Sequence, residues 1–220
     1  MLVTFNKIRI TIPQSLPLLV AGGFLVTFPV FVQAPLVRSY PWLSLILSLG
    51  WFSWGRQSPQ PWGSLLWGFG WTWLCGSLYW GWYRSEPLWH LPMEGLALPW
   101  AIWGLGQRQY RVGSCFYLGS LWGTIVTDLY VWLNDLLPTW CGIVDSSPTP
   151  GETILYAVGQ QLQSPWGLGT AILLTASLIW LAQSVARPGA ADRAVFAGAV
   201  LFTVVTDLLF SLAVFMLTWE

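Results

Sequence analysis

Residues 123–140 read GTIVTDLYVWLNDLLPTW, an apolar run interrupted by an aspartate at position 128. Most of this run has the composition of a helix that crosses a membrane. A charged side chain inside such a helix is costly, so it normally faces the bundle interior or a water-filled cavity. The stretch therefore predicts a membrane-spanning helix that carries a polar site.

The rest of the chain has a similar composition. Only 8% of the 220 residues are charged and 55% are apolar, which leaves too little polar surface for a soluble domain. The apolar stretches are continuous, whereas the strands of a membrane barrel alternate. Nine basic residues balance nine acidic residues, so no surplus positive charge favours nucleic-acid binding. These features predict one all-α transmembrane domain, a polytopic helix bundle, over residues 1–220.

Seven apolar stretches approach the roughly 20 residues that a helix needs to cross a bilayer. They cover residues 15–35, 40–55, 61–83, 88–106, 113–137, 165–186 and 193–218. The second stretch is short, and a re-entrant path for it would leave six spans. Seven spans with the N-terminus inside give the stronger bias of basic residues toward the inner side, as the positive-inside rule requires. This arrangement places on the inner side Lys7, Arg9, Arg56, Arg108, Arg111, Arg187 and Arg193, with Arg38 and Arg84 outside.

The fifth and seventh stretches share a motif. Residues 119–140 match residues 198–219 at nine of 22 aligned positions, and both copies contain T-x-x-T-D. One outer loop and one span separate the copies, so both copies would run in the same direction. We expect a parallel internal repeat, as found in some transporter folds.

The two copies place acidic residues at similar depth. At a rise of about 1.5 Å per residue, Asp128 and Asp207 would lie about 14 to 17 Å below the outer surface, and Glu94 about 9 Å below it. No lysine or arginine is expected nearby unless Arg84 reaches inward, so these carboxylates would hold a proton or a metal cation. In the alternative interpretation, each aspartate only bonds to threonines or backbone and fixes helix packing. The candidate proton-binding or ion-binding residues are Asp128, Asp207, Glu94, Thr124, Thr127, Thr203 and Thr206.

His90 is the only histidine, and it precedes Glu94 by four residues. It is a candidate pigment ligand, as an axial ligand to a chlorophyll or a haem near the outer surface. The alternative is a histidine at the membrane surface that binds only water. The sequence itself requires no cofactor.

The outer loop, residues 138–164, contains the segment TPGETILYAVGQQLQ. Thr149 as the N-cap, Pro150 as the first helical residue and Glu152 as the returning side chain of a capping box predict a helix. Its apolar residues would share one face, which is typical of a short helix lying in the membrane interface.

The stretch FPVFVQAPLVRSYPW, residues 28–42, resembles the opening of an uncharacterised family of polytopic membrane proteins from cyanobacteria. This resemblance implies a photosynthetic organism and a location in its plasma or thylakoid membrane. It carries over no known site.

The sequence supports two functional hypotheses. The first is a small transporter or permease-like subunit that uses the carboxylate cluster. The second is a non-catalytic accessory or assembly protein of photosynthetic complexes, whose 18 tryptophans contact pigments or other membrane subunits. No nucleophile elbow, phosphate loop or paired-histidine motif is present, so we do not expect an enzyme. The expected partners are the lipid bilayer and other membrane subunits.

Overall fold

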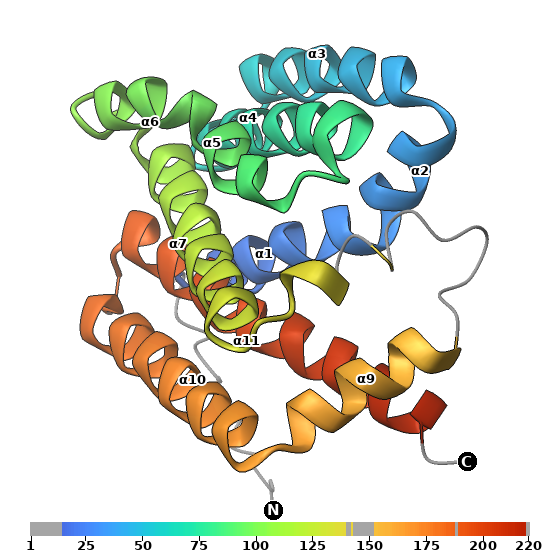
Figure 1. Cartoon of the computed structure of the whole chain (residues 1–220). Coiled ribbons are helices and arrows are strands. Elements are labelled where there is room, and N and C mark those ends of the chain that lie inside the picture. The colour runs from blue at the N-terminus through green and yellow to red at the C-terminus, as the bar shows by residue number, and fades with distance from the viewer. Residues whose placement is uncertain (1–14, 140–141, 143–151, 188, 219–220) are drawn as a thin grey trace, which may run out of the picture.

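A computed structural model describes residues 15–139, 142, 152–187 and 189–218, and the regular elements in these ranges are all helices. Helix α1 (Ser15–Phe28) continues through the π-helix η1 (Pro29–Gln33) into α2 (Ala34–Ser39). Next come α3 (Pro41–Gln57) and α4 (Trp62–Leu78), which continues into the π-helix η2 (Tyr79–Tyr83). The following segment consists of η3 (Pro87–Trp89), α5 (His90–Glu94), η4 (Gly95–Ala97) and α6 (Leu98–Leu105). The C-terminal half contains α7 (Arg111–Leu133), α9 (Glu152–Gln163), α10 (Pro165–Val185) and α11 (Ala191–Thr218) (Figure 1).

The prediction of an all-α fold is confirmed for the described residues. Each of the seven apolar stretches is helical, and the helix ends differ from the predicted ones by only a few residues. The fourth stretch is not one straight helix, because prolines at positions 87, 92 and 99 remove backbone donors and limit each helical piece to a few residues. This break matters for the site, because it places α5 against α7.

Three helical segments are long and apolar enough to cross a membrane. They are Ser15–Ser39, Pro165–Val185 and Ala191–Ala213. Helices α3 and α4 have only 17 residues each, and α7 includes serine, glycine, threonine and tyrosine, which lower its hydropathy. Seven crossings therefore remain a prediction.

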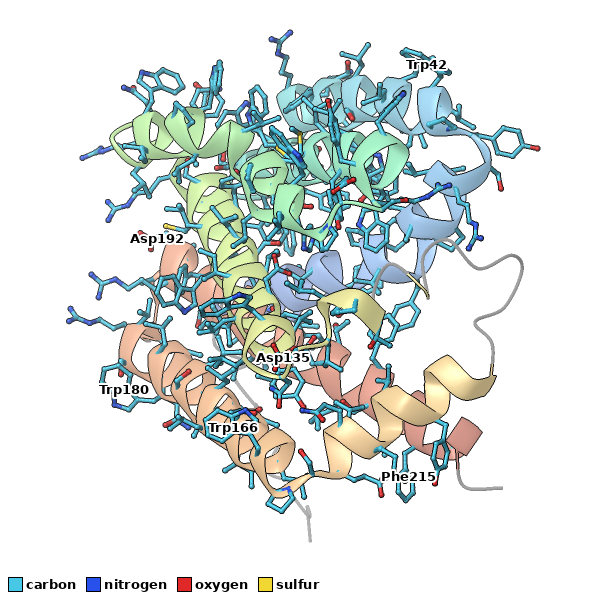
Figure 2. All side chains as sticks on the ribbon, viewed as in Figure 1. Trp42, Asp135, Trp166, Trp180, Asp192 and Phe215 are labelled. Carbon is cyan, nitrogen blue, oxygen red and sulfur yellow. The ribbon has the colours of Figure 1, made fainter. Side chains whose placement is uncertain are left out.

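Large apolar side chains cover much of the outer surface of the bundle. Figure 2 shows Trp166 and Trp180 projecting from α10 at one edge and Trp42 on α3 at the opposite edge. These three indole side chains belong to residues that are 61 to 69% exposed. An exterior of this kind suits contact with lipid, where exposed apolar surface carries no cost.

Helix α7 lies between the α3–α4 layer and helices α10 and α11 (Figure 1). Helices α7 and α11 run parallel, because the residue numbers on both helices rise together from one contacting pair to the next. The contacting pairs are Gly119 with Ala199, Gly123 with Thr203, and Thr127 with Asp207. Helix α1 also runs parallel to α11, because Leu19 contacts Gly198 and Thr27 contacts Thr206.

The predicted helix in the outer loop is present as α9, which packs against α10 and α11. Its predicted capping residues Thr149 and Pro150 lie outside the described residues, as do Lys7 and Arg9.

Candidate functional site

Two titratable side chains from different helices, His90 and Asp128, form a hydrogen bond. His90 is the first residue of α5, and Asp128 lies toward the C-terminal end of α7. The imidazole Nδ1 is 2.8 Å from the Asp128 Oδ1, and the two side chains are 18% and 24% exposed. An ionised carboxylate can only accept hydrogen bonds, so Nδ1 carries the proton. Among the described residues this leaves Nε2 without a hydrogen bond.

Aromatic side chains from the π-helix η2 fix the orientation of the imidazole ring. The Tyr79 ring stacks on His90 with a centroid distance of 4.3 Å and an interplanar angle of 29°. Tyr79 is completely buried, so its ring is a fixed platform. Trp80 meets the imidazole edge-on, with centroids 6.4 Å apart. A π-helical turn shifts the side chains that follow it around the helix axis, and such turns often occur at functional sites.

Glu94 completes this group. It lies one helical turn after His90 on α5, and it interacts electrostatically with both His90 and Asp128. The Tyr117 hydroxyl of α7 donates a hydrogen bond to the backbone carbonyl oxygen of Glu94. Helix α5 is therefore tied to α7 at both of its ends, by the His90–Asp128 pair and by the bond from Tyr117.

Asp207 has a different partner. Its Oδ2 accepts a hydrogen bond of 3.0 Å from the Thr127 hydroxyl of α7. The residue before it, Thr206, is buried, and its hydroxyl lies 3.1 Å from the Thr27 hydroxyl of α1. The two aspartates of the shared motif thus face different neighbours, Asp128 toward α5 and Asp207 toward α7.

The remaining threonines of the predicted cluster bond locally. The hydroxyls of Thr124 and Thr203 donate to the carbonyl oxygens of Ser120 and Ala199, each four residues earlier in the same helix. The structure therefore brings together His90 and Asp128, and separately Thr127 and Asp207, while Glu94 lies one helical turn from His90 on α5. Thr124 and Thr203 have no hydrogen bond to either aspartate in the described part of the chain.

The sequence did not predict that His90 would be the partner of Asp128. Depth counted along straight helices placed Asp128 well below the surface and His90 close to it. The broken fourth segment makes this count invalid, because α5 packs directly on α7. The spacing of His90 and Glu94 was visible in the sequence, but no local pattern indicates which distant helix an imidazole will contact.

Metal binding has no support from the geometry. Within the residues that the structure describes, no group of three or more histidine, cysteine, aspartate or glutamate side chains is placed to hold a metal ion. The acidic residues and His90 together can bind, hold and release a proton.

The His90–Asp128 contact predicts which imidazole nitrogen is protonated. In ¹⁵N-labelled protein at a pH where the imidazole is neutral, Nδ1 should carry the hydrogen and Nε2 should not. Because His90 is the only histidine, its NMR signals need no assignment once a purification tag is removed. In Asp128→Asn the amide can donate as well as accept a hydrogen bond. We therefore expect the tautomer of His90 that carries its hydrogen on Nε2 to become populated. A neutral imidazole that carries its hydrogen on Nε2 in the wild-type protein would contradict the described contact.

The fold and the site together define a class, an all-helical protein with helices of membrane-spanning length and a half-buried histidine–carboxylate group. The chain belongs to the family described as "Protein of unknown function (DUF3120)", whose model matches residues 22–215. That range contains residues 28–42, so the predicted membership of an uncharacterised family is confirmed at this level. No curated protein matches the chain. No solved structure matches it either.

Proposed function

We propose that the protein is a small membrane transporter or permease-like subunit that binds and releases a proton at His90, Asp128 and Glu94. The observation that carries this proposal is the His90–Asp128 pair, a half-buried histidine–carboxylate hydrogen bond in a chain of which 8% is charged. Titratable groups in an apolar bundle are costly, and in membrane proteins they commonly mark ion or proton pathways.

The proposal includes seven spans and a parallel duplication of the fifth and seventh. Helices α7 and α11 pack in parallel, with Thr127 on Asp207 and Gly123 on Thr203. This register is close to the offset at which the two sequence copies align. Helices α3 and α4 pack in opposite directions, since Gly55 contacts Gly63 near one end and Ser44 contacts Ser77 near the other. Both features support alternating spans.

Reconstitution into liposomes tests the proposed function. A pH gradient is imposed across the membrane, and a pH-sensitive dye in the lumen reports its decay. We expect the gradient to decay faster with the wild-type protein than in protein-free liposomes of the same lipid composition. The rate should increase with the amount of protein per liposome. A decay equal to that of protein-free liposomes would contradict proton transport by the isolated chain.

A second candidate function is the accessory or assembly role in photosynthetic complexes. The Nε2 of His90, which lacks a hydrogen bond among the described residues, favours it as a pigment ligand, and the exposed tryptophans supply contact surface. This role would place the protein in the plasma or thylakoid membrane of a cyanobacterium. Purification from native membranes in mild detergent separates the two functions. Co-migration with a chlorophyll-containing complex supports the accessory role, and a colourless isolated protein counts against it.

A further inference from the structure

Three polar side-chain pairs join four helices in series. From α1 to α5, the pairs are Thr27 with Thr206 at 3.1 Å, Asp207 with Thr127 at 3.0 Å, and Asp128 with His90 at 2.8 Å. We call these six residues the threonine–aspartate layer. It crosses the bundle through α1, α11, α7 and α5, whose packing order is the same.

The two T-D dipeptides of the layer have the same role in their helices. Consecutive side chains of an α-helix point about 100° apart, so each dipeptide reaches two different neighbours. In α11, Thr206 contacts α1 while Asp207 contacts α7. In α7, Thr127 contacts α11 while Asp128 contacts α5. Each threonine therefore faces the preceding helix of the series, and each aspartate faces the following one.

The ends of the layer differ in chemistry. At the α1 end, the Thr27 and Thr206 hydroxyls also lie within hydrogen-bond distance of carbonyl oxygens one turn earlier in their own helices. This end therefore needs no titratable group. At the α5 end, the layer terminates in His90, whose imidazole can bind or release a proton. Asp207 and Asp128 are the titratable groups between Thr27 and His90.

Thr127 connects the two aspartates through the backbone of α7. It directly precedes Asp128, and its hydroxyl donates to Asp207. A hydroxyl has one proton to donate, so this bond requires Asp207 to offer an acceptor oxygen. Away from water such a bond is stronger than in solution, and its loss is more costly. A change at Asp207 therefore changes how α7 presents the Asp128 side chain to His90.

We infer that the threonine–aspartate layer couples His90 to Asp207, so that Thr127 and Asp207 are positioning residues for the proton site. This inference rests on the proposed function of that site. The charged and titratable groups that face His90 are Asp128 from α7, Glu94 from α5 and Tyr79 from η2. Asp207 is faced by Thr127 from α7. Asp207 lies on the opposite side of α7 from His90, and its role is to influence the pH at which His90 binds a proton.

The test follows the protonation of His90 by ¹⁵N NMR in detergent micelles as the pH is varied. Thr127→Val removes the hydroxyl without changing shape or charge, and Asp207→Asn removes the charge. We expect each variant to move the pH midpoint of His90 by about 0.3 pH unit or more. Thr127→Ser, which retains the hydroxyl, should restore the wild-type midpoint.

Two matched controls exclude general effects. Thr124→Val removes a hydroxyl that bonds only to its own helix, and Asp135→Asn removes an exposed carboxylate just beyond the end of α7. Both should leave the midpoint of His90 unchanged. The inference is overturned if folded Thr127→Val titrates like the wild type, or if Thr124→Val shifts the midpoint equally. If Thr127→Val does not fold, Asp207→Asn and Thr127→Ser are compared instead. The inference is then overturned if Asp207→Asn has the wild-type midpoint of His90, or if Thr127→Ser shifts the midpoint equally. The titration requires no transport, so a lack of proton flux would contradict the proposed function and not this coupling.

Discussion

Liposomes that contain the Asp128→Asn variant are expected to show at least about tenfold less protein-dependent proton flux than wild-type liposomes. Asparagine has nearly the shape of aspartate but cannot take up or release a proton. It also removes the anionic acceptor that lies 2.8 Å from the imidazole of His90. The rate of luminal dye response per reconstituted protein is the measurement.

The matched control is Asp135→Asn. Asp135 is exposed, and it has a positive φ of 51°, a conformation that asparagine adopts readily. This variant also loses one carboxylate near the end of α7, and it should retain the wild-type rate. If Asp128→Asn transports as fast as Asp135→Asn, the His90–Asp128 pair has no part in proton movement.

A large loss of stability is expected from a substitution where α4 and α7 cross. The backbones of these helices touch at Gly68 and Gly113, and the Gly113 amide donates a 2.9 Å hydrogen bond to the Ser64 hydroxyl. A Cβ atom on Gly113 would overlap the Ser64 carbonyl oxygen, which is backbone and cannot move alone. We expect Gly113→Ala to lower the free energy of unfolding by about 2 kcal/mol or more, as overpacking of a tight contact does. Thermal unfolding in mild detergent measures the loss.

Gly50→Ala is the control for that substitution. Gly50 lies on the exposed side of α3, and a Cβ atom there would meet no atom within 4 Å. Alanine favours a helix over glycine by about 1 kcal/mol, so this variant should be as stable as the wild type or slightly more stable. Equal stability of Gly113→Ala and Gly50→Ala would show that the two helices do not cross at Gly68 and Gly113.

The helices themselves were predictable because continuous apolar stretches of membrane length leave few alternatives. Pro87 and Pro92 break the fourth stretch, because proline cannot continue a regular helix hydrogen-bond pattern. The parallel direction of α7 and α11 agrees with the prediction from their shared motif. The π-helix that begins at Tyr79 could not be predicted, because no residue type marks such a turn in a single sequence.

The site was only partly predictable, for a physical reason. The spacing along one helix identifies residues on the same face, and it selected Asp128, Glu94 and Asp207 as candidate site residues. Which partner each carboxylate finds depends on how different helices pack, and this is decided by contacts far apart in sequence. The expectation from the sequence covered only lysine and arginine as basic partners of the carboxylates, whereas the partner of Asp128 is His90.

The central claim is that His90 and Asp128 act as one proton-binding unit. A double-mutant cycle tests it most directly, with His90→Gln, Asp128→Asn and the combined variant reconstituted at equal amounts and compared for proton flux. If the two residues act together, the double variant should transport no more slowly than the slower single variant, because either change already disables the unit. Flux losses that multiply in the double variant would show that the two side chains act independently, contrary to this claim.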